Sequence, residues 1–285
     1  MYTAKIENRS GEILQLNGNE SEFQVLSITG LNPPQAQINT TTVVGLDGAK
    51  FNSSKLETRE IVIRMRLNGN VELNRQTLYR YFPTKMWVKF YFRNENRDVF
   101  IEGYVESVEV NLFSKSEIMQ MAILCPQPYF KSLEEVIDSI SKVTPVFYFP
   151  FAINIGEPEI ISSLDLNQIT DIVNASATET GLVIQISIFA SMSKIKIQNT
   201  ETGEAITLAH TFLPDDLVTI NTNKGQKSVT LLRDGESSNL FSAVEKGSVF
   251  FQLMPGDNYF SYVVTGAQDS DVDIVFRHHT VYRGV

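Results

Sequence analysis

The chain has 285 residues, of which 42% are hydrophobic, and its 24 Lys and Arg against 33 Asp and Glu give a formal net charge of −9. This length and apolar content allow a sizeable core and favour two domains. No apolar run approaches the roughly 18 residues of a membrane-spanning helix. The N-terminal residues show no signal pattern, and the single cysteine excludes an internal disulfide.

The charge is distributed unevenly along the chain. Residues 1–130 hold 14 Lys and Arg and 14 Asp and Glu, whereas residues 131–285 hold 10 and 19. A neutral half suits burial in an assembly, and an acidic half suits exposure to solvent. Neither half has the basic excess of a nucleic-acid reader, so no sequence-specific nucleic-acid partner is predicted.

The first 50 residues predict a polar hairpin followed by a strand. That strand runs from Phe23 to Thr29 and is stopped by Gly30 and Pro33-Pro34. Residues 35–50 then predict a long loop or hairpin that makes little core of its own. Such a segment inside a compact domain is usually functional or covers a partner.

Strong strand patterns follow. Residues 59–67 alternate between apolar and charged side chains, and residues 71–82 change to the spacing of a short helix that ends at Pro83. Alternation returns in residues 86–92. It continues in residues 101–112, where the apolar phase switches near Glu106-Ser107 and predicts a β-bulge.

The middle of the chain predicts a domain boundary. A strand over residues 118–125 ends in Cys125-Pro126-Gln127-Pro128, where the prolines prevent a sheet from continuing. Ser132 and Glu135 then have capping-box spacing ahead of one apolar face, which predicts a helix. The expected division is therefore a mainly β domain over 1–130, a Pro-flanked helical linker over 131–144 and a second domain over 145–285.

The second domain is predicted to be almost purely β. Its many short strands are separated by Gly, Asn, Asp and Pro turns, which indicates an antiparallel sandwich or jelly roll. The expected strands cover residues 147–155, 182–188, 194–198, 205–208, 216–220, 228–232, 249–253, 259–265 and 271–277.

The sequence shows no constellation for catalysis or for a cofactor. No glycine-rich phosphate loop precedes a helix, and the histidines have no metal-ligand spacing, so they are expected at the surface or rim. Pairs of acidic residues could resemble a glycosidase dyad, but turns and sandwich surfaces commonly carry such pairs. The residues considered are His210, His278, His279, Glu157, Glu159, Asp215, Asp216, Asp257, Asp271 and Asp273. No catalytic, cofactor-binding or metal-binding residue is predicted.

Other single residues have simple structural interpretations. Cys125 is expected to be a buried small hydrophobe rather than a nucleophile. Ile186 is expected in a core, whereas Asp271 and His278 are expected to tolerate replacement.

Several short motifs, taken in their order, resemble the distal tail proteins (Dit, the siphovirus tail-component family) of long-tailed bacteriophages. The resemblance extends over nearly the whole chain. The motifs are residues 28–34, Gly45-Leu46-Asp47-Gly48, Phe51-Asn52-Ser53-Ser54, Arg59-Glu60-Ile61, Cys125 to Phe130, Phe149-Pro150-Phe151, Phe276-Arg277 and Tyr282-Arg283-Gly284-Val285.

The resemblance implies a ring-forming, tail-tube-like N-terminal β domain and a galectin-like C-terminal β-sandwich. It implies a structural virion component at the tail tip, made in the bacterial host cytoplasm, whose typically hexameric ring joins the tail tube to the tail-tip or baseplate hub. The implied partners are further copies, the tail tube protein and the tail-tip or hub protein, and a receptor-binding protein is left open. The resemblance implies no enzyme activity.

A second function class stays open, namely a carbohydrate-binding adhesin module for attachment to the host surface. A galectin-like fold does not by itself imply sugar binding. Galectin sites stack a sugar on Trp, and the single tryptophan, Trp87, lies outside the second domain.

Overall fold

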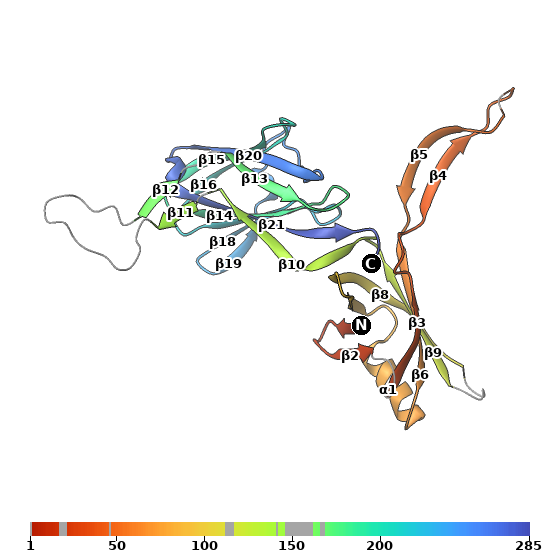
Figure 1. Ribbon diagram of the computed structural model, residues 1–285. Helices are drawn as coiled ribbons and strands as arrows, with labels where there is room; N and C mark the ends of the chain where they lie inside the picture. Colours follow the sequence, from red (N-terminus) through yellow and green to blue (C-terminus); the bar gives the residue numbers. More distant parts are fainter. Residues whose placement is uncertain are drawn as a thin grey trace. The chain divides into compact units, whose positions relative to one another are not determined.

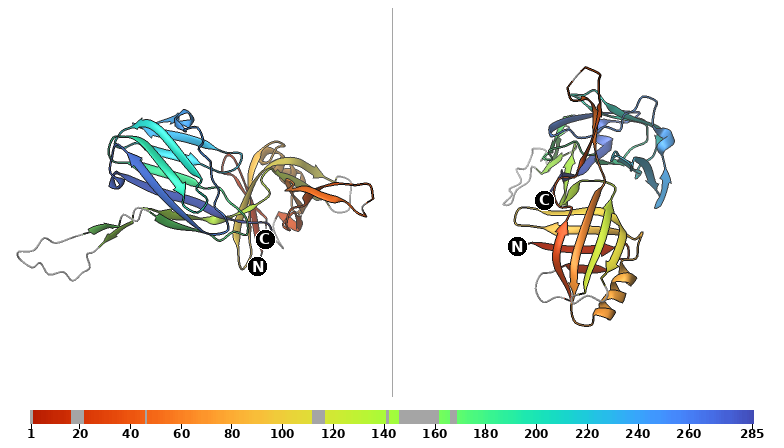
Figure 2. Two further views of the ribbon diagram at one scale, coloured as in Figure 1. Left: turned by 90° about the horizontal axis from the view of Figure 1, so that it is seen from above. Right: turned by 90° about the vertical axis from the view of Figure 1, so that its right-hand side faces the viewer.

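The computed structural model describes residues 2–16, 22–45, 47–111, 117–140, 142–145, 162–165 and 169–285 (Figures 1 and 2). Its contacts separate into two compact units. Unit 1 contains residues 1–133 and 281–285, and unit 2 contains residues 134–280. The described chain is mainly β, with antiparallel sheets and a single α-helix, as predicted.

Unit 1 is built on one antiparallel sheet in the order β3-β6-β9-β8-β7-β1-β2, and its two edge strands, β2 and β3, contact each other. The beginning of β10 adds to β8 through Lys131 and Phe100. Figure 2 (right) shows these strands side by side with α1 along them. The bounds are β1 Thr3–Asn8, β2 Ile13–Leu16, β3 Phe23–Thr29, β6 Arg59–Leu67, α1 Val71–Tyr81, β7 Trp87–Arg93, β8 Asp98–Val110, β9 Ile118–Cys125 and β10 Phe130–Ser139.

The alternating pattern of β6 explains the position of the unit 1 core. Its odd-numbered residues are all buried, and they pack with inward residues of the neighbouring strands and with Leu78 and Phe82 at α1. The helix starts at Asn70, whose side chain accepts a hydrogen bond from the Leu73 backbone N–H, and it ends before Pro83. The predicted helix is therefore confirmed.

Two β-bulges shift the register of this sheet. In the pairing of β8 with β9, the register moves between Val105 and Ser107, which confirms the bulge expected at Glu106-Ser107. A second shift, between Val25 and Ser27, leaves Leu26 as the extra residue of β3. Each bulge turns the following side chains to the face that the apolar pattern requires.

Unit 1 also carries a separate two-stranded ribbon, β4 (Ala36–Thr41) and β5 (Lys50–Leu56). We call residues 36–56 the arm. It projects from the sheet of unit 1 (Figure 1). The prediction of a loop or hairpin with little core is confirmed, because every described arm residue except Leu56 is exposed.

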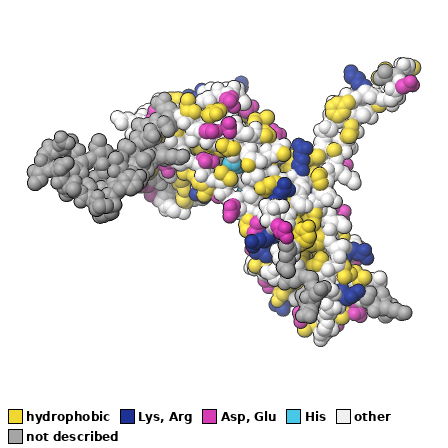
Figure 3. Space-filling view, viewed as in Figure 1, with side chains coloured by type: hydrophobic (Ala, Val, Ile, Leu, Met, Phe, Trp, Pro, Cys, Tyr) yellow, Lys and Arg dark blue, Asp and Glu magenta, His cyan; other side chains and the backbone are white. Residues whose placement is uncertain are grey.

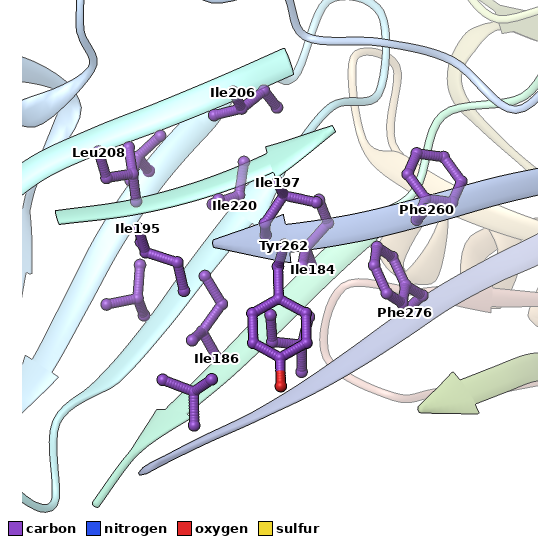
Figure 4. Close-up of a cluster of buried hydrophobic side chains, with 14 of the residues drawn as sticks. Ile184, Ile186, Ile195, Ile197, Ile206, Leu208, Ile220, Phe260, Tyr262 and Phe276 are labelled. Atoms are coloured by element: carbon purple, nitrogen blue, oxygen red, sulfur yellow. The ribbon is translucent and has the colours of Figure 1, made fainter. Parts of the chain in front are cut away.

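Unit 2 contains two antiparallel sheets that enclose one apolar core. One sheet has the order β19-β18-β17-β14-β21-β10, and the other has the order β13-β20-β15-β16. Inward residues of both sheets, including Ile186, Phe260 and Phe276, meet in the core (Figure 4). The bounds are β11 Lys142–Pro145, β12 Ser162–Asp165, β13 Ile169–Asn174, β14 Val183–Ile188, β15 Met192–Asn199, β16 Ala205–Phe212, β17 Leu217–Asn221, β18 Ser228–Arg233, β19 Glu236–Asn239, η1 Phe241–Ala243, β20 Gly256–Thr265, η2 Asp269–Asp271 and β21 Val272–Tyr282.

The predicted helical linker over 131–144 is wrong. Residues 130–139 form strand β10, and residues 142–145 form β11. The backbone N–H of Ile140 donates to the carbonyl of Ile274, and the Ile140 side chain enters the unit 2 core. Pairing with neighbouring strands therefore overrides the local helical spacing.

The predicted strand over 249–253 is also wrong. Phe251 and Leu253 are buried, but the Phe251 N–H donates to the carbonyl of Val249, a tight turn that interrupts an extended ladder. The strand predicted over 147–155 lies outside the described residues. So does the turn that Ser114-Lys115-Ser116 predict between the strands at 101–112 and 118–125.

Candidate assembly surface

The arm exposes large apolar side chains without a core beneath them. Ile38 is 63% exposed and Phe51 is 60% exposed, and Val44 near the tip is fully exposed. The ribbon register pairs Thr40 with Phe51, and Ile38 lies two residues before Thr40, so Ile38 and Phe51 share one face. Figure 3 shows hydrophobic side chains along the projecting arm.

An isolated two-stranded ribbon is at best marginally stable in water, because it has no hydrophobic face to bury. The arm has only local polar support, such as the 2.6 Å hydrogen bond from Asn52 Nδ2 to Thr41 Oγ1. A surface that presents Ile38 and Phe51 together is typical of a segment covered by a partner. The arm is therefore the principal candidate interface of unit 1.

The base of the arm is organised by the guanidinium of Arg59, which is only 3% exposed. It donates to the carbonyls of Pro128 at 2.8 Å, Asn32 at 2.6 Å and Arg283 at 2.5 Å, and also to the carbonyl of Gly30. Burial lowers the pKa of Arg59. Several separate motifs of the sequence resemblance therefore meet at one buried cation, which the sequence alone did not indicate.

Glycine is required where the chain enters this base. Gly30 has a φ of +87°, and a Cβ atom there would lie 2.0 Å from the carbonyl oxygen of Glu60. The close approach brings the residues before the arm against β6, and the N–H of Glu57 donates to the carbonyl of Gln35 to close the ribbon. The two ends of the arm are thus fixed to each other and to the sheet.

A hollow of about 460 Å³ lies beside the arm base. Its walls include Glu57, Glu60 and Glu106. No group of three His, Cys, Asp or Glu among the described residues could hold a metal ion. The hollow therefore offers carboxylates at the surface but no metal-binding geometry.

The residues considered for chemistry lie apart in unit 2. Asp216 forms a bidentate ion pair with Arg233 at 2.7 and 2.6 Å and accepts a hydrogen bond from the Leu213 N–H. Hydrogen bonding by Arg233 lowers the pKa of Asp216. This carboxylate is thus committed to structure at its turn.

The other acidic residues have similar local roles. Asp271 accepts from the Gln268 N–H at the start of η2, and Asp273 accepts from Ser139 Oγ at 3.1 Å. Asp257 lies on β20 opposite Val173, and Asp215 adopts a positive φ of 69° in the turn before β17. Glu157 and Glu159 lie outside the described residues.

The prediction that His278 lies at the surface or rim is wrong. Its side chain is 2% exposed and lies on the inward face of β21, in line with Ile274 and Phe276. Burial lowers the pKa of His278, and the nearby Asp138 carboxylate and Val173 backbone oppose part of that shift. The other two histidines, His279 and His210, are half-buried. The His210 ring packs edge-on against the Phe212 ring, with 5.3 Å between the ring centres.

Cys125 behaves as predicted. It is fully buried at the end of β9, and burial raises the pKa of its thiol to about 12. A thiol with so high a pKa is not a nucleophile at neutral pH. Its role is to pack in the unit 1 core.

The family comparison agrees with this architecture. Residues 8–120 match the model of a phage tail protein RIFT-related domain, and residues 175–279 match the C-terminal domain of a siphovirus-type tail component. Together the two models match more than half of the chain. The chain belongs to the siphovirus-type distal tail proteins.

Solved structures share the fold over the full length. The Dit (gp 19.1) protein of phage SPP1, described as a paradigm of the hub adsorption apparatus in Gram-positive infecting phages, is 14% identical, with a TM-score of 0.70 over 98% of this chain and 99% of that one. Two phage p2 baseplate structures, in the activated conformation with Sr or Ca, are 12% and 11% identical. Their TM-scores are 0.56 and 0.54, with 98% of each chain covered. No curated protein matches the sequence significantly.

Membership of this family makes the chain a structural component of a phage tail. In the part of the chain that the structure describes, no helix is long and apolar enough to span a membrane. The galectin-like assignment of unit 2 and the tail-tube-like assignment of unit 1 stay predictions.

Proposed function

We propose that the protein is a distal tail hub component that closes a ring of identical subunits between the tail tube and the tail tip. The observation that carries this proposal is the arm, whose apolar face is left exposed by the described residues of the chain. In a cyclic ring, one patch of each subunit contacts a different patch of the next, and every patch is used. An arm that projects from the sheet of unit 1 suits such a head-to-tail contact.

The charge distribution supports the same proposal. Unit 1 has 16 Lys and Arg against 14 Asp and Glu, whereas unit 2 has 8 against 19. Copies of the nearly neutral unit 1 can be brought together with little repulsion, while the acidic unit 2 is suited to exposure. We propose six subunits, by family resemblance, with the tail tube and tail-tip proteins as neighbours and host cytoplasm as the place of synthesis.

In this role the protein acts through interfaces and not through catalysis. The adhesin alternative has no specific observation in its favour, because unit 2 contains no tryptophan and its described polar residues serve local turns and ion pairs. A glycan array probed with the full-length protein separates the two functions. A saturable hit would support the adhesin.

The ring itself is tested by native mass spectrometry and negative-stain electron microscopy at tens of micromolar protein. The double variant Ile38→Ser/Phe51→Ser should remove the apolar face of the arm and abolish the ring. Its matched control, Gln37→Ser/Lys50→Ser, changes two exposed residues on the opposite face of the same ribbon. Wild-type protein that stays monomeric, or rings that persist in the apolar double variant, would contradict the proposal.

A further inference from the structure

Five residues that follow unit 2 in the sequence belong to unit 1. We call residues 281–285 the closing segment. Val281 is 7% exposed, and Tyr282 and Val285 pack against the unit 1 core. The closing segment is therefore part of the folded unit 1 and not a loose tail.

Nearly every residue of the closing segment makes a polar contact with another part of unit 1. Arg59 Nη2 donates to the carbonyl of Arg283, and Arg97 Nη1 donates to the carbonyl of Gly284 at 2.6 Å. The N–H of Val285 donates to the carbonyl of Leu31 at 3.1 Å. The guanidinium of Arg97 also lies 4.5 Å from the centre of the Tyr282 ring, a cation–π distance.

These contacts involve the residues just before β4, where the chain enters the arm. Leu31 and Pro33 lie just before β4, and a Cβ at Gly284 would come within 3.0 Å of the Pro33 backbone N. Arg59, which lies just after β5, joins the carbonyls of Gly30 and Asn32 to that of Arg283. The closing segment thus bridges both ends of the ribbon.

We infer that the closing segment is a clamp that sets the direction of the arm. Because the arm has no core of its own, its orientation depends on the residues at its base. Fixing that base before association lowers the ordering cost that an interface must overcome. The consequence for ring closure rests on the proposed function above, whereas the clamping of the base does not.

The test compares full-length variants by hydrogen exchange at the backbone amides of residues 30–32, 35 and 57–60, since Pro33 and Pro34 have no N–H. Arg97→Gln removes the bond to Gly284 and the contact with Tyr282, and Gly284→Ala presses a methyl group against Pro33. Arg93→Gln is the matched control, since Arg93 lies on the same β7–β8 hairpin and its side chain is 69% exposed, with Asp98 at 4.0 Å. Exchange in unit 2 serves as the internal reference.

We expect exchange at the arm base to rise about tenfold in Arg97→Gln and Gly284→Ala, with little change in Arg93→Gln. Arg97→Lys, which keeps a donor, should restore part of the protection. Because Arg97 is exposed, Arg97→Gln still decides the question if Gly284→Ala unfolds unit 1. Unchanged exchange at the arm base in Arg97→Gln would overturn the clamp.

Ring assembly is measured on the same variants and separates the two proposals. The clamp predicts that Arg97→Gln needs a higher protein concentration to form rings than Arg93→Gln does. Equal ring formation despite faster exchange would overturn the role of the clamp in assembly. If wild-type protein forms no ring, the proposed function fails, while the exchange experiment still decides whether the base is clamped.

Discussion

The guanidinium carbon of Arg59 lies 4.6 Å from the centre of the Phe130 ring, so a buried cation on β6 rests on an aromatic side chain of β10. Four backbone carbonyls surround the same guanidinium. A buried charge is tolerated only when such partners replace its hydration. Replacement of Arg59 is therefore expected to destabilise unit 1.

We predict that Arg59→Leu destabilises unit 1 by about 3 kcal/mol or more, because several buried carbonyls lose their donor. The measurement is urea unfolding followed by the fluorescence of Trp87, which is the only tryptophan and lies on β7 of unit 1. Arg59→Lys should also destabilise, because a single ammonium cannot reach all four carbonyls. A urea midpoint for Arg59→Leu equal to that of wild type would show that the network contributes no stability.

Gly30→Ala should destabilise unit 1 even though it adds only one methyl group. The φ of +87° is unfavourable for alanine, and the new Cβ would overlap the carbonyl of Glu60. Trp87-detected unfolding measures the effect. Gly11→Ala, at a φ of +81° with open space around the Cβ, is the control for conformational strain alone and should cost less. Equal losses in the two variants would mean that the contact with Glu60 is unimportant.

The stability of unit 2 should fall on acidification because of His278. Burial holds the pKa of His278 below its ordinary value of 6.5, so the unfolded chain takes up the proton first as the pH falls. This contribution to the free energy of unfolding is complete above pH 6.5. It decreases as the pH falls below 6.5, by at most about 1.4 kcal/mol per pH unit. Asp138, Glu135 and His279 lie near enough to modulate the effect.

The measurement is urea unfolding of unit 2 by circular dichroism between about pH 5 and 8. His278→Leu should flatten the dependence near pH 6. Identical pH profiles for wild type and His278→Leu would rule out His278 as the source.

Ile186→Ala should destabilise unit 2 by about 2–5 kcal/mol, because it leaves a cavity among tightly packed residues. Ile186 is fully buried in the sandwich core. Asp271→Ala should cost about 1 kcal/mol or less, since it removes a capping interaction at a short surface helix. A loss as large for Asp271→Ala as for Ile186→Ala would contradict this assignment of the core.

The division into domains remains a proposal, and it predicts which fragment folds. Residues 134–280 alone should melt cooperatively, because they contain both sheets of unit 2. A fragment of 145–285 should be much less stable, since it lacks β10 and the buried Ile140. Calorimetry of the two fragments tests this, and equal melting temperatures would show that β10 is dispensable.

Strands with clean alternation could be predicted from sequence, and so could the bulge near Glu106, because each depends on neighbouring residues alone. β10 could not, because Ser132 and Glu135 fit a helix cap equally well and only pairing with distant strands decides between the two. His278 was misassigned for a related reason. Its burial follows from its position in line with Phe276, and the strand was expected to end at Arg277.

The candidate interface was only partly visible in the sequence. The run Thr40-Thr41-Thr42 and the glycines at 45 and 48 indicated a loop or hairpin with little core. The shared face of Ile38 and Phe51, however, depends on a register shift in the ribbon. The meeting of Gly30, Arg59, Pro128 and Arg283 involves contacts across up to 224 residues. No local pattern could have revealed it.

The route of the chain has a consequence for how such proteins can vary. Strands β10 and β21 each contain residues of both units, and they are neighbours in one sheet. In topological terms, unit 2 is an insertion between two adjacent strands, and unit 1 resumes after it. Insertions are tolerated where their two ends lie close together. Replacing residues 134–280 by another module should leave Arg59 and Arg97 bound to the returning chain, so we expect unit 2 to be exchangeable while the arm keeps its place on unit 1.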